Sequence, residues 1–189
     1  MLLESFVCTE SSDVMIIDSV RFMKPSDFDV LLSDITETDL FLIAEMEGAP
    51  YLNISVQRPK FPVEGMLMGT NRRYMVNLLA RRKHSRDFKN VVFMVDTGSP
   101  YTFLSKTAMA AMVGSNANIP PILKLEIQGD NAIVCHLSPP DKHFADVNLL
   151  GTDYLEMKGI NLITDWPRRT FALHDIDSFK RETSQKCIT

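Results

Sequence analysis

Hydrophobic and polar residues alternate over short stretches from Tyr51 onward, and residues that favour turns separate these stretches. Such alternation is typical of β-strands that face a core on one side. The stretches with this pattern are 51–56, 72–80, 90–95, 122–128, 132–138 and a final pair on either side of a turn at 165–169. Because consecutive stretches are close in the sequence, they predict antiparallel hairpins and a mostly β domain.

Two segments of this domain have helical character. Residues 106–113 predict a short helix that ends at Gly114, because glycine adopts the backbone conformations that end helices. Residues 146–159 pass from a short apolar strand through Gly151 into a helix-like stretch that ends at Gly159. We therefore expect one or two short helices within the β domain.

The first fifty residues are less regular and predict an α/β or irregular extension. Residues 13–23 have the apolar run of a strand. Residues 24–35 predict a short helix with Pro25 and Ser26 near its start. Residues 38–46 are compatible with either a helix or a strand.

The same fifty residues are strongly acidic. They carry eleven Asp and Glu side chains against two basic ones, whereas the rest of the chain has a net positive charge. This asymmetry is explained either by two parts that attract each other, within one chain or across a dimer, or by two independently solvated surfaces.

Length and composition fit one globular domain with an extension, since 45% of the 189 residues are hydrophobic and 23% are charged. We place an acidic N-terminal extension or small subdomain at 1–50, the main domain at 51–177 and a polar flexible tail at 178–189. The sequence has no apolar run of about 18 residues and no basic leader, and its three cysteines show no paired spacing. A soluble, cytoplasmic protein with free thiols is expected, with no membrane partner.

A basic cluster lies in the loop of the first hairpin and consists of Arg81, Arg82, Lys83, Arg86 and Lys89. No aromatic platform accompanies it, so a solvated loop is favoured and nucleic-acid binding is not expected. His136 and His143 have only Cys135 near them in sequence, which does not make a set of metal ligands. We expect neither a metal nor another cofactor.

The most informative position is Asp96, which directly follows the apolar strand predicted at 90–95. Thr97, Gly98 and Ser99 come next, so a carboxylate stands between a buried strand and a tight turn. Such an aspartate can simply build an Asx turn, in which its side chain accepts a backbone N–H. It can also bind magnesium in phosphoryl transfer, although no glycine-rich phosphate loop accompanies it here, or act as an acid or base.

Three features together resemble the retropepsin-like aspartic proteases, over roughly residues 70–175. They are the triplet Asp96-Thr97-Gly98 after an apolar strand, the segment Leu149-Leu150-Gly151, and the closing strand pair at 160–173. The hairpin at 123–134 also resembles the one that precedes the second motif in that family. The resemblance implies a retropepsin-like acid protease β-barrel and an aspartic endopeptidase that cuts extended, apolar-flanked peptide segments.

In this family two neighbouring carboxylates share one proton, so one acts as a base toward water and the other as an acid toward the peptide carbonyl. The resemblance implies that Asp96 is catalytic and that Thr97 bonds across to its symmetry mate. Gly98 permits the tight turn, and the Ser99 hydroxyl is expected to hydrogen-bond the Asp96 carboxylate. Leu149, Leu150 and Gly151 are the supporting motif, in which Gly151 lets the strand pack directly beneath the catalytic loop.

The chain has a single Asp-Thr-Gly triplet, so the pair of carboxylates requires a homodimer with Asp96 from each copy. Family members close the site with a glycine-rich hairpin flap. Only residues 105–122 are available for it and they contain one glycine, which predicts a shortened or absent flap. The N-terminal extension or residues 57–71 would then cover the site. A weakly active or non-catalytic dimerisation or peptide-binding module is therefore the alternative function.

Overall fold

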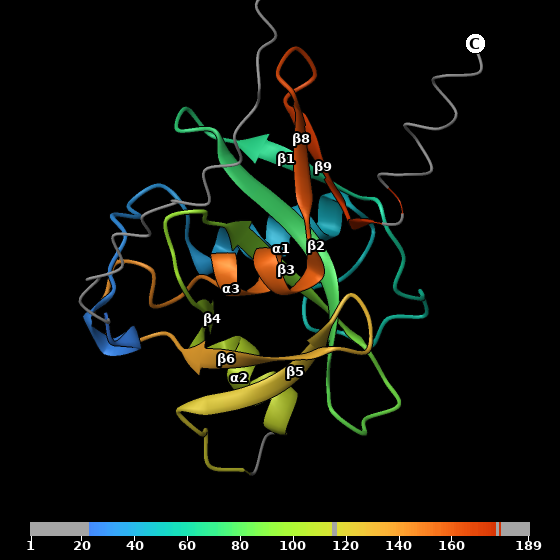
Figure 1. Cartoon of the computed structure of the whole chain (residues 1–189). Coiled ribbons are helices and arrows are strands. Elements are labelled where there is room, and N and C mark those ends of the chain that lie inside the picture. Colours follow the sequence, from blue (N-terminus) through green and yellow to red (C-terminus); the bar gives the residue numbers. More distant parts are fainter. Residues whose placement is uncertain (1–22, 115–116, 177, 179–189) are drawn as a thin grey trace, which may run out of the picture.

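The computed structural model describes residues 23–114, 117–176 and 178 (Figure 1). These residues form a mostly β structure with three α-helices and one short 3-10 helix. The strands are β1 (Val63–Met68), β2 (Arg73–Arg82), β3 (Lys89–Val95), β4 (Thr102–Leu104), β5 (Ile122–Ile127), β6 (Ala132–Leu137), β7 (Leu149–Leu150), β8 (Asn161–Asp165) and β9 (Thr170–His174). The helices are η1 (Pro25–Asp27), α1 (Glu37–Met46), α2 (Lys106–Val113) and α3 (Thr152–Lys158).

The nine strands belong to one hydrogen-bonded sheet in the order β3-β7-β4-β6-β5-β2-β1-β9-β8. Strand β3 also pairs with β2, so the pairings among the first six strands of this order close on themselves. Strands β1, β9 and β8 continue from β2 as an antiparallel arm whose edge is β8. Figure 1 shows this arm at the top of the view and the β5–β6 hairpin at its base.

Most of the elements predicted after residue 70 are confirmed. The predicted hairpins correspond to β2–β3, β5–β6 and β8–β9, each paired antiparallel. Helix α2 ends before Gly114 and α3 ends before Gly159, and both glycines have positive φ angles of 99° and 58°. A side chain is strained in such a conformation, which is why glycine ends these helices.

Two predictions nearer the N-terminus are wrong. Residues 51–56 form only an isolated bridge between Ile54 and Lys89 rather than a strand. Residues 24–35 form only the single turn η1, because the rest of that segment runs over the core with Phe28, Leu32 and Ile35 buried. Strand β1 was not predicted, although its burial of Gly65 and Leu67 has the period of two that marks a strand. The strand predicted at 13–23 lies outside the described residues, apart from its last one.

Residues 28–51 share the hydrophobic core of the β domain. The Phe28 ring stacks on Phe103 at 5.8 Å between centroids and lies 5.7 Å from Phe144. Helix α1, which resolves the ambiguity of residues 38–46, buries Leu40 and Ile43 in the same core cluster. The hydrophobic core therefore runs across residue 50. The division of the chain into two domains at that residue stays a prediction.

The acidic extension and the basic remainder are joined within one chain. Asp34 forms an ion pair with Arg73 at 2.9 Å and also accepts a hydrogen bond from Asn71 at 2.7 Å. Asp29 pairs with the ring of His143 at 2.9 Å. These contacts support attraction between the two parts, although each pair keeps some exposure to solvent and contributes little energy alone.

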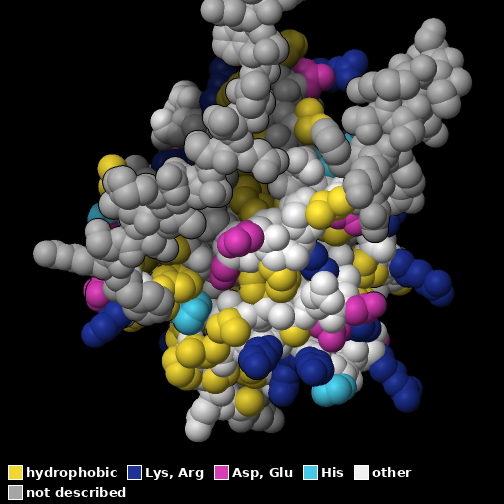
Figure 2. All heavy atoms as spheres, viewed as in Figure 1, with side chains coloured by type: hydrophobic (Ala, Val, Ile, Leu, Met, Phe, Trp, Pro, Cys, Tyr) yellow, Lys and Arg dark blue, Asp and Glu magenta, His cyan; other side chains and the backbone are white. Residues whose placement is uncertain are grey.

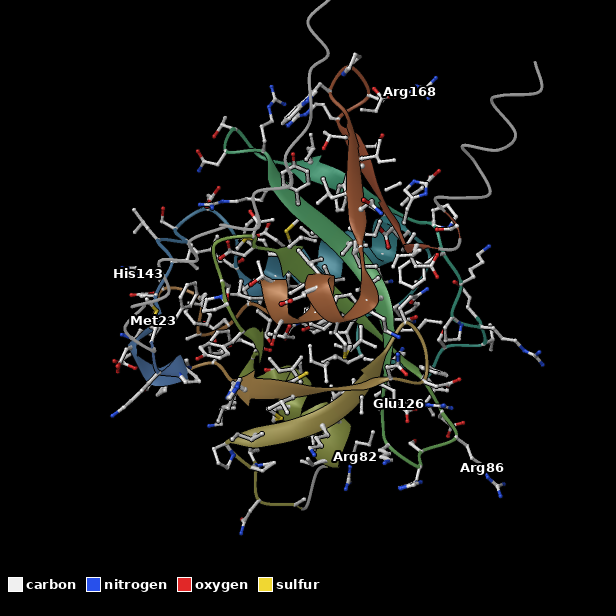
Figure 3. All side chains as sticks on the ribbon, in the orientation of Figure 1. Met23, Arg82, Arg86, Glu126, His143 and Arg168 are labelled. Carbon is white, nitrogen blue, oxygen red and sulfur yellow. The ribbon has the colours of Figure 1, made fainter. Side chains whose placement is uncertain are left out.

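The predicted basic cluster is partly engaged in the fold. Arg81 pairs with Glu126 at 2.7 Å and Asp130 at 3.0 Å, and Lys89 donates to the Leu52 carbonyl at 3.1 Å. Arg86 points away from the body of the molecule (Figure 3). Across the described residues, no helix has the length and apolar character needed to cross a membrane.

Candidate active site

Asp96 stands where a buried parallel strand pair ends. Strands β3 and β7 pair in parallel with Met94 opposite Leu149 and Val95 opposite Leu150. The Asp96 N–H then donates to the Leu150 carbonyl at 3.1 Å. The segment Leu149-Leu150 therefore holds the backbone of Asp96. The loop that follows Asp96 leaves the sheet.

The loop after Asp96 is a tight turn that presents its tip to solvent. The Gly98 N–H donates to Asp96 Oδ1 at 2.9 Å, and the Ser99 N–H donates to the Asp96 carbonyl at 3.1 Å. Thr97 and Gly98 are exposed. The first contact is an Asx turn, so the simple structural explanation of Asp96 accounts for one carboxylate oxygen.

The second carboxylate oxygen of Asp96 is not explained by this turn. Asp96 Oδ2 is buried and has no hydrogen-bond partner among the described residues. A buried carboxylate oxygen without a donor destabilises a fold unless a proton or a donor reaches it. The loop thus holds a carboxyl group with one oxygen that lacks a partner within the described part of the chain.

The predicted role of Ser99 is wrong. Its side chain is fully buried, and its hydroxyl donates to the Tyr101 carbonyl at 2.6 Å rather than to the Asp96 carboxylate. The hydroxyl lies on the inner side of the turn, where the nearest acceptor is the backbone two residues ahead. Ser99 therefore shapes the loop from inside and leaves the Asp96 carboxylate without that donor.

Leu149, Leu150 and Gly151 lie directly beneath this loop. A Cβ atom on Gly151 would lie 2.3 Å from the Tyr101 carbonyl oxygen, a distance that no side chain tolerates. Just beyond Gly151, the Thr152 N–H donates to the Ser99 carbonyl at 2.8 Å. Glycine is needed at this position because two backbone segments touch there.

Asp153 is a structural residue of the site that sequence analysis did not identify. One of its carboxylate oxygens accepts from the Thr102 N–H at 2.9 Å, and the other accepts from the Thr102 hydroxyl at 2.7 Å and the Tyr154 N–H at 2.8 Å. The Thr102 hydroxyl in turn accepts from the Gly151 N–H at 3.2 Å. The sequence signal for this role of Asp153 was its position as an acid in the first turn of a helix that begins right after Gly151.

Asn148 is a second residue that the sequence did not reveal. It is fully buried, and its Oδ1 accepts from the Ser105 N–H at 2.9 Å. Its amide nitrogen donates to the Val92 carbonyl at 2.9 Å and the Tyr51 hydroxyl at 2.7 Å. Burial raises the pKa of Tyr51 to about 12, so the hydroxyl stays protonated. This network fixes β7 beside β3 and the start of α2.

The segment in which a flap is expected contains a helix. Helix α2 occupies Lys106–Val113, and no strand is present among residues 105–114 and 117–121. The β5–β6 hairpin that follows exposes Ile122 and Val134, and Figure 2 shows hydrophobic and basic side chains together over this hairpin. A shortened or absent flap within residues 105–122 stays a prediction.

The two segments predicted as alternative covers lie in different places. The start of the described chain reaches the site loop, because the Tyr101 hydroxyl donates to the Met23 carbonyl at 2.6 Å. Met23 and His143 lie on the same side of the molecule in Figure 3. Residues 57–71 instead include strand β1, and the Gln128 amide donates to the Lys60 carbonyl at 2.7 Å. That either segment covers Asp96 stays a prediction.

The histidines and cysteine considered as metal ligands have other surroundings. The His136 ring packs against Tyr101 at 5.3 Å, His143 pairs with Asp29, and Cys135 is buried with a raised pKa caused mainly by that burial. Among the residues that the structure describes, no three His, Cys, Asp or Glu side chains are grouped so as to hold a metal ion.

Comparison with known proteins gives a likeness at the level of structure. No protein-family model matches the sequence, and no curated protein matches it. Among solved structures, the chain is similar to a retropepsin-like aspartic protease from Rickettsia conorii, with 20% identity over 65% of this chain and 96% of that chain. The TM-score is 0.41, an overlap too loose to carry an inference about fold or activity.

Proposed function

We propose that this chain is a retropepsin-like aspartic endopeptidase that acts as a homodimer, with Asp96 of each copy forming the catalytic pair. The observation that carries the proposal is the Asp96 carboxyl group. One oxygen is held by Gly98 at 2.9 Å, and the other is buried, next to the exposed Thr97 and Gly98, with no partner among the residues that the structure describes. A second Asp96 across a two-fold axis supplies the missing contact, because two close carboxyl groups share one proton.

In such a dimer the ionised member of the pair removes a proton from water, and the water attacks the peptide carbonyl. The protonated member gives its proton to the carbonyl oxygen. The pair then again holds one proton, taken from the water, and that proton serves the later steps of hydrolysis. The rigid support of the loop by β7 and Gly151 is what this chemistry requires, since small displacements of paired carboxyl groups reduce catalysis strongly. Extended, apolar-flanked peptides are the proposed substrates.

The proposal is tested with an unstructured protein substrate, incubated with the full chain over a range of pH values. Wild type is compared with Asp96→Asn, and Asp146→Asn serves as the matched control because Asp146 is an exposed aspartate outside the site. We expect wild type and the control to cut, and Asp96→Asn to lose cleavage by orders of magnitude while its oligomeric state is unchanged. Undiminished cleavage by Asp96→Asn would refute the proposal.

A second candidate is a dimerisation or peptide-binding module with the same loop but little turnover. The observation that favours it is helix α2, which stands where family members are expected to have a flap that excludes water. Saturable binding of an unstructured peptide, with no product at any pH, would establish this candidate over the peptidase.

A further inference from the structure

A polar pocket lies away from the Asp96 loop, between the C-terminal end of α1, residues 57–64 and the sheet. Its volume is about 380 Å³, within the range of sites that hold small molecules. None of the residues that line it belongs to the Asp96–Ser99 loop or to the supporting Leu149–Gly151 segment. The pocket therefore has no part in the activity proposed above.

The walls of this pocket are fixed by side chains that bind the backbone. Gln128 is 6% exposed, its oxygen accepts from the Leu79 N–H at 3.1 Å, and its nitrogen donates to the Lys60 carbonyl at 2.7 Å. Asn90 is equally buried and donates to the Pro50 carbonyl at 3.3 Å. Because these contacts hold strands, loop and helix end together, the pocket is preformed rather than a gap between mobile segments.

Two side chains of the lining offer hydrogen-bond acceptors. Asn77 Oδ1 is buried and has no partner among the described residues. Glu47 is an exposed residue of the same lining, and its carboxyl group receives a hydrogen bond from the Asn77 side chain. Burial raises the pKa of Glu47, and the bond from Asn77 offsets part of that increase. A ligand group with several N–H donors and a positive charge satisfies both acceptors.

Two further residues of the lining carry a positive charge. Arg58 and Lys60 line it, are exposed, and form no ion pair within the described part of the chain. Pro62, Val63 and Leu79 add apolar surface to the lining, and Glu64 adds a second exposed carboxylate. A ligand that matches all three features carries an ammonium group, an aliphatic body and a carboxylate.

We propose that this pocket binds a free aliphatic α-amino acid, with its ammonium group on Glu47 and Asn77 and its carboxylate toward Arg58 and Lys60. Recognition of both charged groups, together with apolar contact, makes the site selective for a zwitterion over either single charge. The ligand is not required for the Asp96 chemistry, so this inference stands or falls independently of the proposed peptidase.

The test is isothermal titration calorimetry of the full chain with three probes of nearly equal shape. L-leucine has both charges, leucinamide lacks the carboxylate, and 4-methylpentanoate lacks the ammonium group. We expect saturable binding of L-leucine and at least about tenfold weaker binding of each of the other two. No saturable L-leucine binding up to about 10 mM, or equal binding of all three probes, would overturn the inference.

Variants then locate the binding site. Glu47→Gln keeps the shape of the side chain and should weaken L-leucine binding at least about tenfold, and Arg58→Ala should weaken L-leucine but not leucinamide. Glu45→Gln is the matched control, because Glu45 is an exposed acid on the same helix outside the pocket. Unchanged L-leucine affinity in a folded Glu47→Gln variant would place the ligand elsewhere and reject the site. Asp96→Asn should bind L-leucine as wild type does.

Discussion

Replacing Gly151 by alanine should destabilise the fold through one contact. The added Cβ would lie 2.3 Å from the Tyr101 carbonyl oxygen and 2.4 Å from its carbonyl carbon, about 1 Å inside ordinary van der Waals contact. Neither side can yield easily, because backbone hydrogen bonds join Asp96 to Leu150 at 3.1 Å and Thr152 to Ser99 at 2.8 Å. Overpacking against fixed backbone typically costs 1–3 kcal/mol, and we expect about 2 kcal/mol or more here.

Thermal unfolding measures this cost directly. For a chain of this size about 2 kcal/mol lowers Tm by roughly 4–8 °C. The matched control is Gly98→Ala in the same loop, where a Cβ would meet only the Asp96 carboxylate oxygen at 3.2 Å, a neighbour that can move. We expect Gly98→Ala to keep a Tm near that of wild type. A Gly151→Ala variant as stable as Gly98→Ala would refute the close approach of the two segments.

Three further predictions concern buried and charged polar groups. Asp153→Ala removes the acceptors of the Thr102 N–H and hydroxyl and should cost about 3 kcal/mol in urea unfolding. Asp153→Asn keeps one acceptor oxygen and should cost clearly less, so equal losses would contradict the view that the acceptor atoms, and not the charge alone, carry the stabilisation. Asn148→Ala leaves several buried groups unpaired and should cost about 2–4 kcal/mol, so a change below about 1 kcal/mol would argue against that network. The hydrogen bond from Arg73 is the main cause of a lowered pKa for Asp34, so its stabilisation is present above the unfolded pKa near pH 4 and is lost as pH falls through the folded value. The difference in Tm between wild type and Asp34→Asn should therefore be positive at pH 7 and shrink below about pH 4, and a pH-independent difference would contradict this linkage.

The parts of the fold that sequence predicts are those decided by local pattern. Strands β2 and β3 alternate or run apolar between polar turns, and Gly114 and Gly159 mark helix ends by their backbone freedom. The sequence also predicted the junction of a buried strand with Asp96, because the apolar run and the polar turn are adjacent in the chain. Gly151 was predicted only through a resemblance, since its contact with Tyr101 joins segments that are distant in the sequence.

The features that sequence did not predict depend on tertiary contacts. Residues 24–35 have a helical start signal, but Phe28 gains more by packing between Phe103 and Phe144 than a short isolated helix provides. The Ser99 hydroxyl had two possible acceptors in one turn, and only the folded loop decides that it binds the Tyr101 carbonyl. In the sequence, Asp153 resembles any acid in the first turn of a helix. Its role becomes clear only in the folded chain, where the Thr102 hydroxyl donates to it.

The most direct test of the Asp96 pair is a subunit-mixing experiment. Wild-type and Asp96→Asn chains are combined in equal amounts at constant total concentration, under conditions in which subunits exchange, and cleavage is measured. If both carboxyl groups of a dimer are required, random pairing leaves about a quarter of the dimers active, so activity should fall to about a quarter of the wild-type value. A fall to one half would mean that each Asp96 acts alone, and the paired-carboxylate account would be wrong.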